Sequence, residues 1–168
     1  MLEEKQGQTE KVGEIVKRAF KKLSKAQAGI TRSQWLNEAR KCEDLNNLEC
    51  CKAIIQNLLP YDLTVQLSTI TDQNLKEKEM RRIWIEEAKF CESEKAILSA
   101  RTLLREVIKQ FPQKKKLWMA WISMEENLGT SESLAEVMKE SCATVTKNKV
   151  ILVLKYSKHI WKKLNNPE

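Results

Sequence analysis

The sequence predicts an all-α fold, an α-solenoid of antiparallel helix pairs. Three observations predict it: few turn-forming residues, a tryptophan-led motif that recurs along the chain, and an apolar spacing that recurs after each copy. The 168 residues include only four glycines and three prolines. So few turn-formers argue against a β-sandwich or β-barrel, while an apolar content of 42% is sufficient for a buried core.

The recurring motif covers nine residues and predicts the first helix of each pair. Residues 35–43 (WLNEARKCE) match residues 84–92 (WIEEAKFCE) at five of nine positions. Counted from the tryptophan, alanine falls at +4 and cysteine at +7 in both copies, which places them on one side of a helix. Trp118 follows 34 residues after the tryptophan of the second copy. We expect five residues to anchor the packing between helices: Trp35, Ala39, Trp84, Ala88 and Trp118.

The five tryptophans do not share one helical phase. Trp35, Trp84 and Trp118 lie at the motif's first position. This shared phase favours a packing role over the alternative, a base-stacking platform for single-stranded RNA. Because Trp121 and Trp161 lie off that phase, we expect them to be freer to face a neighbouring molecule.

A second apolar spacing predicts the second helix of each pair. Counted from Trp35, Trp84 and Trp118, the residues at +16, +19, +20, +23 and +24 are all apolar except Ser141. This spacing forms one stripe on a helix antiparallel to the first. The stripes are Cys51, Ile54, Ile55, Leu58 and Leu59; Ala100, Leu103, Leu104, Val107 and Ile108; and Leu134, Val137, Met138, Ser141 and Cys142.

These spacings predict a single helical-repeat domain over residues 1–168. It should comprise a half repeat at 8–28, repeats at 31–60, 74–112 and 115–145, and a half repeat at 148–164. Because the terminal units are half repeats, their apolar edges could pair with a partner or with another copy of the chain.

Capping and helix-breaking residues predict the helix boundaries. Three residues that precede Gln or Glu by three positions are expected to cap helices: Thr31, Asn46 and Asn74. Three others are expected to mark helix ends: Pro60, Pro112 and Gly129. The first two tryptophans of the motif are 49 residues apart rather than 34, and most of the excess, at 61–73, is expected to form an extended loop.

The net charge of +7 is concentrated near both ends of the sequence. Residues 1–30 carry +3 and residues 145–168 carry +5, whereas residues 31–144 carry −1. This distribution is compatible with an acidic partner or RNA, although charge runs in repeat loops are usually solvated. The candidate contact residues are Lys114, Lys115, Lys116, Lys155, Lys158 and Lys162.

The sequence offers no set of residues suited to catalysis, metal binding or cofactor binding. His159 is the single histidine, the five cysteines form no Cys-x-x-Cys pair, and the four glycines are scattered rather than grouped in a phosphate-binding loop. We therefore expect a non-enzymatic protein without cofactor or metal, with reduced cysteines. The longest apolar run, residues 117–122, is too short to span a membrane.

The helical hairpins resemble the HAT (half-a-tetratricopeptide) repeat. In the second unit Trp84, the Ala100-Arg101 pair, Glu106 and Pro112 match its pattern. The third unit matches at Trp118 and Glu125, whereas the first departs from the pattern at Cys51-Lys52 and the last half repeat lacks the tryptophan. The resemblance implies the same superhelical architecture as in tetratricopeptide repeats.

Within the HAT-repeat proteins the chain resembles an internal section of the pre-mRNA-processing factor 6 family. The similar stretches are Lys11–Ala19, Ile30–Trp35, Phe111–Lys115, and Leu117-Trp118 followed by Glu125 and Gly129–Leu134. The resemblance implies a nuclear scaffold that binds spliceosomal proteins in the tri-snRNP, with RNA contacted indirectly if at all. Two alternatives remain open: direct RNA binding through basic terminal helices, and a general tetratricopeptide-like adaptor for peptides.

Overall fold

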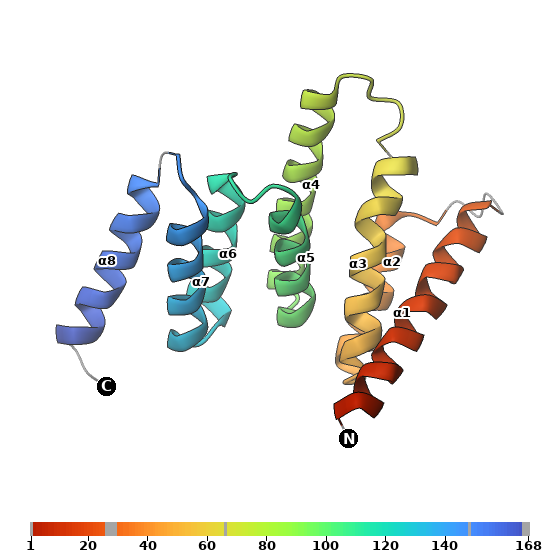
Figure 1. Ribbon diagram of the computed structural model, residues 1–168, viewed down its shortest axis with the longest axis horizontal. Helices are drawn as coiled ribbons and strands as arrows, with labels where there is room; N and C mark the ends of the chain where they lie inside the picture. The colour runs from red at the N-terminus through yellow and green to blue at the C-terminus, as the bar shows by residue number, and fades with distance from the viewer. Residues whose placement is uncertain (1, 26–29, 66, 148, 166–168) are drawn as a thin grey trace. The chain divides into compact units, whose positions relative to one another are not determined.

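The computed structural model describes residues 2–25, 30–65, 67–147 and 149–165, with side chains described at 11–23, 30–60, 67–147, 149–161 and 165. All secondary structure in these ranges is helical (Figure 1). The helices are α1 (Leu2–Lys25), α2 (Arg32–Asp44), α3 (Leu48–Val65), α4 (Gln73–Ser93), α5 (Ile97–Gln110), α6 (Lys115–Leu128), α7 (Ser131–Thr144) and α8 (Val150–Asn165). The predicted fold class, an all-α solenoid of antiparallel helix pairs, is confirmed.

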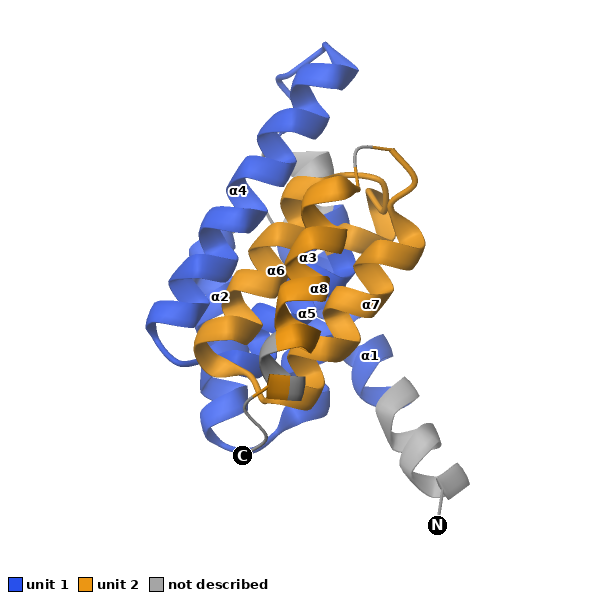
Figure 2. Ribbon diagram, turned by 90° about the vertical axis from the view of Figure 1, so that its left-hand side faces the viewer, with its two compact units in different colours: residues 1–106 blue, residues 107–168 orange. Residues whose placement is uncertain are grey.

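The chain forms two compact units, residues 1–106 and 107–168, which Figure 2 colours separately. Unit 1 contains α1 to α4 and most of α5, and unit 2 contains the end of α5 and α6 to α8. No helix in the described ranges is both long enough and apolar enough to cross a membrane.

In unit 1, α1 and α2 both pack against α3. The rings of Phe20 on α1 and Trp35 on α2 stack with centroids 3.8 Å apart. Polar contacts join the second helices of consecutive hairpins: Cys51 on α3 lies 3.4 Å from the Ser99 hydroxyl on α5, and Gln56 donates to Glu106. Consecutive hairpins therefore stack with matching helices side by side, as the repeat predicts.

The apolar stripes predicted for the second helices form the core. All ten stripe residues of α3 and α5 are buried. In α7 the buried members are Val137, Met138 and Ser141, and the hydroxyl of Ser141 donates to the Met138 carbonyl within the same helix. The single polar residue of the stripes is thus accommodated by a local hydrogen bond.

In unit 2, α7 packs against both α6 and α8. The side chain of Gln113, just before α6, donates to the carbonyl of Thr144 and accepts from the backbone N–H of Thr146. It therefore ties the beginning of α6 to the end of α7. The indole N–H of Trp118 donates to the Pro112 carbonyl at 2.8 Å, which fixes the entry into the same hairpin.

Three boundary predictions are wrong. Pro60 lies inside α3, which continues to Val65, so the beginning of the predicted extended loop is helical. Asn46 adopts a positive φ of 57°, and the side chain of the next residue, Asn47, caps α3 by accepting from the N–H of Cys50. Similarly Asp72, rather than Asn74, caps α4. The predicted capping box of Thr31 is confirmed. The helix ends predicted at Pro112 and Gly129 are also confirmed, because α5 and α6 end just before these residues.

Candidate protein-binding groove

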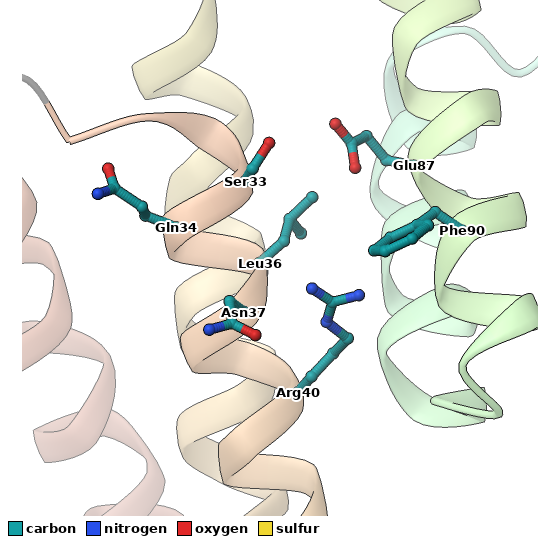
Figure 3. A pocket seen from close by; sticks show the side chains of 7 residues that line it. All are labelled: Ser33, Gln34, Leu36, Asn37, Arg40, Glu87 and Phe90. Atoms are coloured by element: carbon teal, nitrogen blue, oxygen red, sulfur yellow. The ribbon is translucent and has the colours of Figure 1, made fainter.

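A groove of about 490 Å³ lies in unit 1 between the first helices of two consecutive hairpins, α2 and α4 (Figure 3). Its lining combines apolar, amide, hydroxyl and charged side chains. The lining residues are Ser33, Gln34, Leu36, Asn37 and Arg40 from α2, and Glu87 and Phe90 from α4.

The helix that forms one wall begins at a well-defined cap. The Thr31 side chain accepts from the N–H of Gln34, and the Gln34 side-chain oxygen accepts from the N–H of Thr31 at 2.7 Å. This reciprocal pair satisfies two N–H groups that a helix end leaves free. It also orients Gln34, so the carboxamide nitrogen is the part of this side chain that remains as a donor at the groove.

The other end of α2 holds the next hairpin in place. The carboxylate of Glu43 accepts from the backbone N–H groups of Leu98 and Ser99 at 2.7 and 2.9 Å and from the Ser99 hydroxyl at 2.6 Å. These groups form the first turn of α5, where a negative charge is favoured by the helix dipole. A residue of one hairpin therefore caps a helix of the next and fixes the hairpins that form the groove.

The centre of the groove is an arginine stacked on an aromatic ring. The guanidinium carbon of Arg40 lies 4.7 Å from the centroid of the Phe90 ring, which is 48% exposed. Figure 3 shows the Arg40 side chain extending from α2 toward Phe90, with Leu36 beside it. A cation over a ring face is held by the ring quadrupole. Arg40 is thus oriented in advance, at little further entropic cost on binding.

Polar groups surround this centre. Arg32 lies 3.8 Å from Glu87, whose carboxylate faces Ser33 across the groove (Figure 3). Asn37 presents an exposed carboxamide one turn along α2 from Ser33. Carboxamides can both donate to and accept from a peptide backbone. The groove therefore offers apolar contact, a fixed cation and backbone-type hydrogen bonding, which together suit a segment of polypeptide.

The thiols nearest this region are not suited to nucleophilic chemistry. Burial raises the pKa of Cys91 to about 12, and burial, reinforced by a hydrogen bond with Cys50, raises the pKa of Cys42 to about 11. Both remain protonated at neutral pH, and a protonated thiol is a weak nucleophile. In the part of the chain that the structure describes, no group of three or more His, Cys, Asp or Glu residues could hold a metal ion.

Four of the five residues predicted as packing anchors are buried, and none of the five lines the groove. Trp84 and Trp118 are each 1% exposed, and Ala39 and Ala88 are buried. Trp35 is half-buried and borders a second, smaller cavity of about 350 Å³ in the same unit. Within the described residues, the indole nitrogens of Trp35 and Trp84 have no hydrogen-bond partner.

The two off-phase tryptophans differ. Trp161 is exposed, as expected. The prediction that Trp121 is free to face a neighbour is wrong, because it is buried, stacks on Trp118 at a centroid distance of 6.0 Å and donates to Glu125.

The structure separates the candidate lysine contacts. Lys114 and Lys116 are exposed and Lys115 is half-buried at the beginning of α6. Lys155 on α8 instead pairs with Glu126 at 2.9 Å. Glu126 lies ten residues after Lys116, which is roughly 15 Å further along α6. Lys158 is exposed on α8, whereas the side chain of Lys162 lies outside the described residues.

The motif from Glu125 to Ser133, one of the stretches behind the family resemblance, forms the tight turn between α6 and α7. Glu125 is 2% exposed and accepts from the Trp121 indole at 3.0 Å and from the Ser133 hydroxyl at 2.7 Å. A Cβ at Gly129 would collide with the Glu125 carboxylate and the Ser133 hydroxyl. Glycine is required here for space, since its φ of −86° is open to any residue.

Sequence reasoning missed the groove residues Arg40 and Phe90. The available signal was a large aromatic side chain at Phe90, off the phase of the apolar stripe, where the preceding copy of the motif has Lys41. An arginine–ring contact between hairpins also depends on how the hairpins stack, which spacing within one hairpin does not specify.

No protein-family model matches the chain. Among curated proteins, the chain is 28% identical over 142 residues to pre-mRNA-splicing factor prp1 of Schizosaccharomyces pombe and 27% identical over 116 residues to human pre-mRNA-processing factor 6. These matches cover 83% and 69% of this chain but only 14% and 11% of the relatives. Protein STABILIZED1 of Arabidopsis thaliana is 36% identical over 58 residues, which is 34% of this chain and 6% of that protein. The chain is therefore similar over most of its length to a section of pre-mRNA-splicing factor prp1 and of pre-mRNA-processing factor 6, and the resemblance predicted from its motifs is confirmed.

Proposed function

We propose that the chain is a non-enzymatic repeat module that binds proteins of the splicing machinery in the nucleus. The observation that carries the proposal is its similarity, across 83% of its length, to a factor named for pre-mRNA splicing. The finer proposal is a scaffold role in the tri-snRNP. The repeat boundaries predicted above, with the five anchors Trp35, Ala39, Trp84, Ala88 and Trp118, are part of this proposal.

The groove between α2 and α4 is the proposed contact surface. Binding energy at protein interfaces is concentrated in a few residues, with arginine and aromatic residues enriched among them. The stacked pair of Arg40 and Phe90 fits this description, because it combines exposed ring surface with a cation held in one orientation. A partner segment would bury the ring and pair an acceptor with the guanidinium.

The proposal is tested by purifying tagged protein with its partners from nuclear extract, before and after nuclease treatment. Spliceosomal proteins should remain bound after nuclease, and the Arg40→Ala and Phe90→Ala changes should each reduce their recovery about tenfold or more. Lys41→Ala and Leu45→Ala serve as matched controls, because they remove an exposed cation and an exposed apolar side chain of the same helix region outside the groove. Equal recovery with all four variants would refute the groove as the contact surface, and recovery lost on nuclease treatment would refute protein-mediated binding.

A second candidate function, direct RNA contact, is favoured by one observation at the beginning of α6. Lys115 and Lys116 occupy its first turn, which contains no acidic residue. Cations at a helix N-terminus are disfavoured by roughly 0.3–1 kcal/mol each, so helix stability does not account for them. An anionic partner such as a phosphate backbone would.

RNA contact predicts binding of a fluorescent single-stranded oligoribonucleotide that weakens steeply with salt. Replacing Lys114, Lys115 and Lys116 together by Gln should abolish that binding while slightly raising the melting temperature. Absence of binding by the unmodified chain at low salt would eliminate this candidate.

A further inference from the structure

Helix α8 has two apolar faces, of which only one is covered in unit 2. On the inner face Leu152 is fully buried, and Tyr156 and His159 are half-buried against the neighbouring helices. Lys155 closes one edge of this face through its ion pair with Glu126 on α6. The inner face therefore accounts for the packing of α8 on α7.

The outer face carries a second stripe of large apolar side chains. Val150 and Trp161 are each 66% exposed and Leu154 is 55% exposed, and Val153 and Ile160 are also exposed. Counted from Val150, these residues lie at 0, +3, +4, +10 and +11, with Ser157 at +7. Apart from Ser157, this is the spacing of an apolar stripe against which another helix packs.

The charges beside this stripe select the kind of helix that fits. Within Val150–Asn165 the sequence contains no acidic residue. Exposed Lys149 and Lys158 lie on the two sides of the stripe at helical spacing. A second copy of α8 laid against this face would bring like charges together, whereas acidic flanks would pair with them.

A lipid surface fits this face less well. A helix that lies on a membrane has basic residues along its polar face. In α8 the side opposite the outer stripe is apolar rather than basic, because Leu152 and Tyr156 pack there, and Lys155 at its edge is already paired with Glu126. The apolar stripe, interrupted by Ser157 and spaced for a seam, is shaped for a partner helix.

We propose that the outer face of α8 is a docking surface for an amphipathic helix with acidic flanks, supplied by another protein. The partner's apolar stripe lies on Val150, Leu154 and Trp161, and its carboxylates lie beside Lys149 and Lys158. This surface is separate from the groove between α2 and α4, so loss of one leaves the other intact.

The test uses the full chain and a designed helical peptide. The probe is an 18-residue fluorescein-labelled peptide with leucines spaced i, i+3, i+4 and i+7 and glutamates at the flanking positions. Its comparison peptide carries lysine in place of every glutamate. Fluorescence anisotropy should show that the acidic peptide binds, and that the basic peptide binds about tenfold more weakly or not at all at low salt.

Variants place the binding on α8. Leu154→Gln and Trp161→Ala should each weaken binding of the acidic peptide about tenfold, since each removes apolar area that the peptide would cover. Ile15→Gln on α1 is the matched control, because Ile15 is 65% exposed on a helix outside this surface and its replacement should leave binding unchanged. Circular dichroism confirms that the variants fold, as exposed positions allow.

Four outcomes would overturn the proposal. Equal affinity for the two peptides would show that the partner helix does not need acidic flanks. Binding that survives both α8 variants would show that the peptide does not bind to the outer face of α8. Concentration-dependent dimerisation in sedimentation that Leu154→Gln abolishes would assign the face to a second copy. Binding to phosphatidylserine-containing vesicles that Trp161→Ala abolishes, without binding of the acidic peptide, would assign it to lipid.

Discussion

The two units use the same helical hairpin but place their polar links differently. In unit 1 the links connect one hairpin to the next: Glu43 of α2 caps α5, and Arg40 of α2 stacks on Phe90 of α4. In unit 2 two links close the α6–α7 hairpin on itself, Glu125 with Ser133 and Gln113 with Thr146, and the ion pair of Lys155 with Glu126 joins α8 to that hairpin.

This difference shows how a repeat can stay regular in its core while varying at its surface. The apolar stripes fix how helices pair, and they follow one spacing in both units. Polar links bury little area, but they determine which helix surfaces are used in contacts within the chain. In unit 1 they form the walls of the groove, whereas in unit 2 they tighten the turn and the hairpin entry.

The largest expected effect comes from the anchors, which should behave alike in both units. Trp84→Ala and Trp118→Ala should each lower the free energy of unfolding by about 3–5 kcal/mol, because each empties a fully buried site. Denaturant unfolding measures both. Trp84→Phe and Trp118→Phe sharpen the comparison. Trp118→Phe should cost about 1 kcal/mol more, because it also removes the indole hydrogen bond to the Pro112 carbonyl. A loss below 1 kcal/mol for Trp84→Ala would contradict its role as an anchor.

Next in size is the carboxylate that closes the hairpin in unit 2. Glu125→Ala should cost about 2–3 kcal/mol, because it leaves the buried Trp121 indole N–H without this acceptor. Glu126→Ala, at an exposed neighbouring position, is the control and should cost well under 1 kcal/mol. Thermal unfolding of the two variants compares them directly. Equal losses of unfolding free energy would contradict the structural role of Glu125.

The cap between hairpins in unit 1 should contribute less. Glu43→Ala should destabilise the chain by about 1–2 kcal/mol, the usual loss when a helix loses its N-terminal cap. Hydrogen exchange should accelerate at the amides of Leu98 and Ser99, which donate to Glu43. Glu38→Ala, also on α2 but paired only locally with Lys41 in the described structure, should leave exchange at these amides unchanged.

The smallest effect concerns the buried thiol of unit 1 and appears only at high pH. Burial raises the pKa of Cys91 from 9.0 to about 12, so the folded state holds its proton where the unfolded state releases it. The stabilisation is complete below pH 9 and is lost progressively as pH rises from 9 toward 12. Melting temperatures of the unmodified chain should therefore fall between pH 8.5 and 10.5 more steeply than those of Cys91→Ala. Identical slopes would contradict the raised pKa.

The sequence predicted the helix pairing because one spacing recurs in every unit. The buried stripes of α3 and α5 and the capping box at Thr31 lie where that spacing and local capping rules place them. These features depend on residues within one helix or one turn, which sequence patterns report directly.

The errors arose where the structure depends on interactions that a local pattern does not report. Proline usually ends a helix, yet α3 continues through Pro60, with Leu58 and Leu59 buried just before it. Trp121 lies off the anchor phase but is buried against Trp118, with its indole N–H satisfied by Glu125. The groove was not predicted because Arg40 and Phe90 are 50 residues apart and meet only when hairpins stack.

The lengthened helices of unit 1 provide a practical site for attaching probes. α3 has 18 residues and α4 has 21, compared with 14 in α5, so α4 extends roughly 10 Å further than its paired helix (Figure 1). Their connection includes the exposed residues Thr69 and Thr71. A dye attached to a cysteine introduced at Thr69 or Thr71 would report on complexes of the chain from outside the lining of the groove.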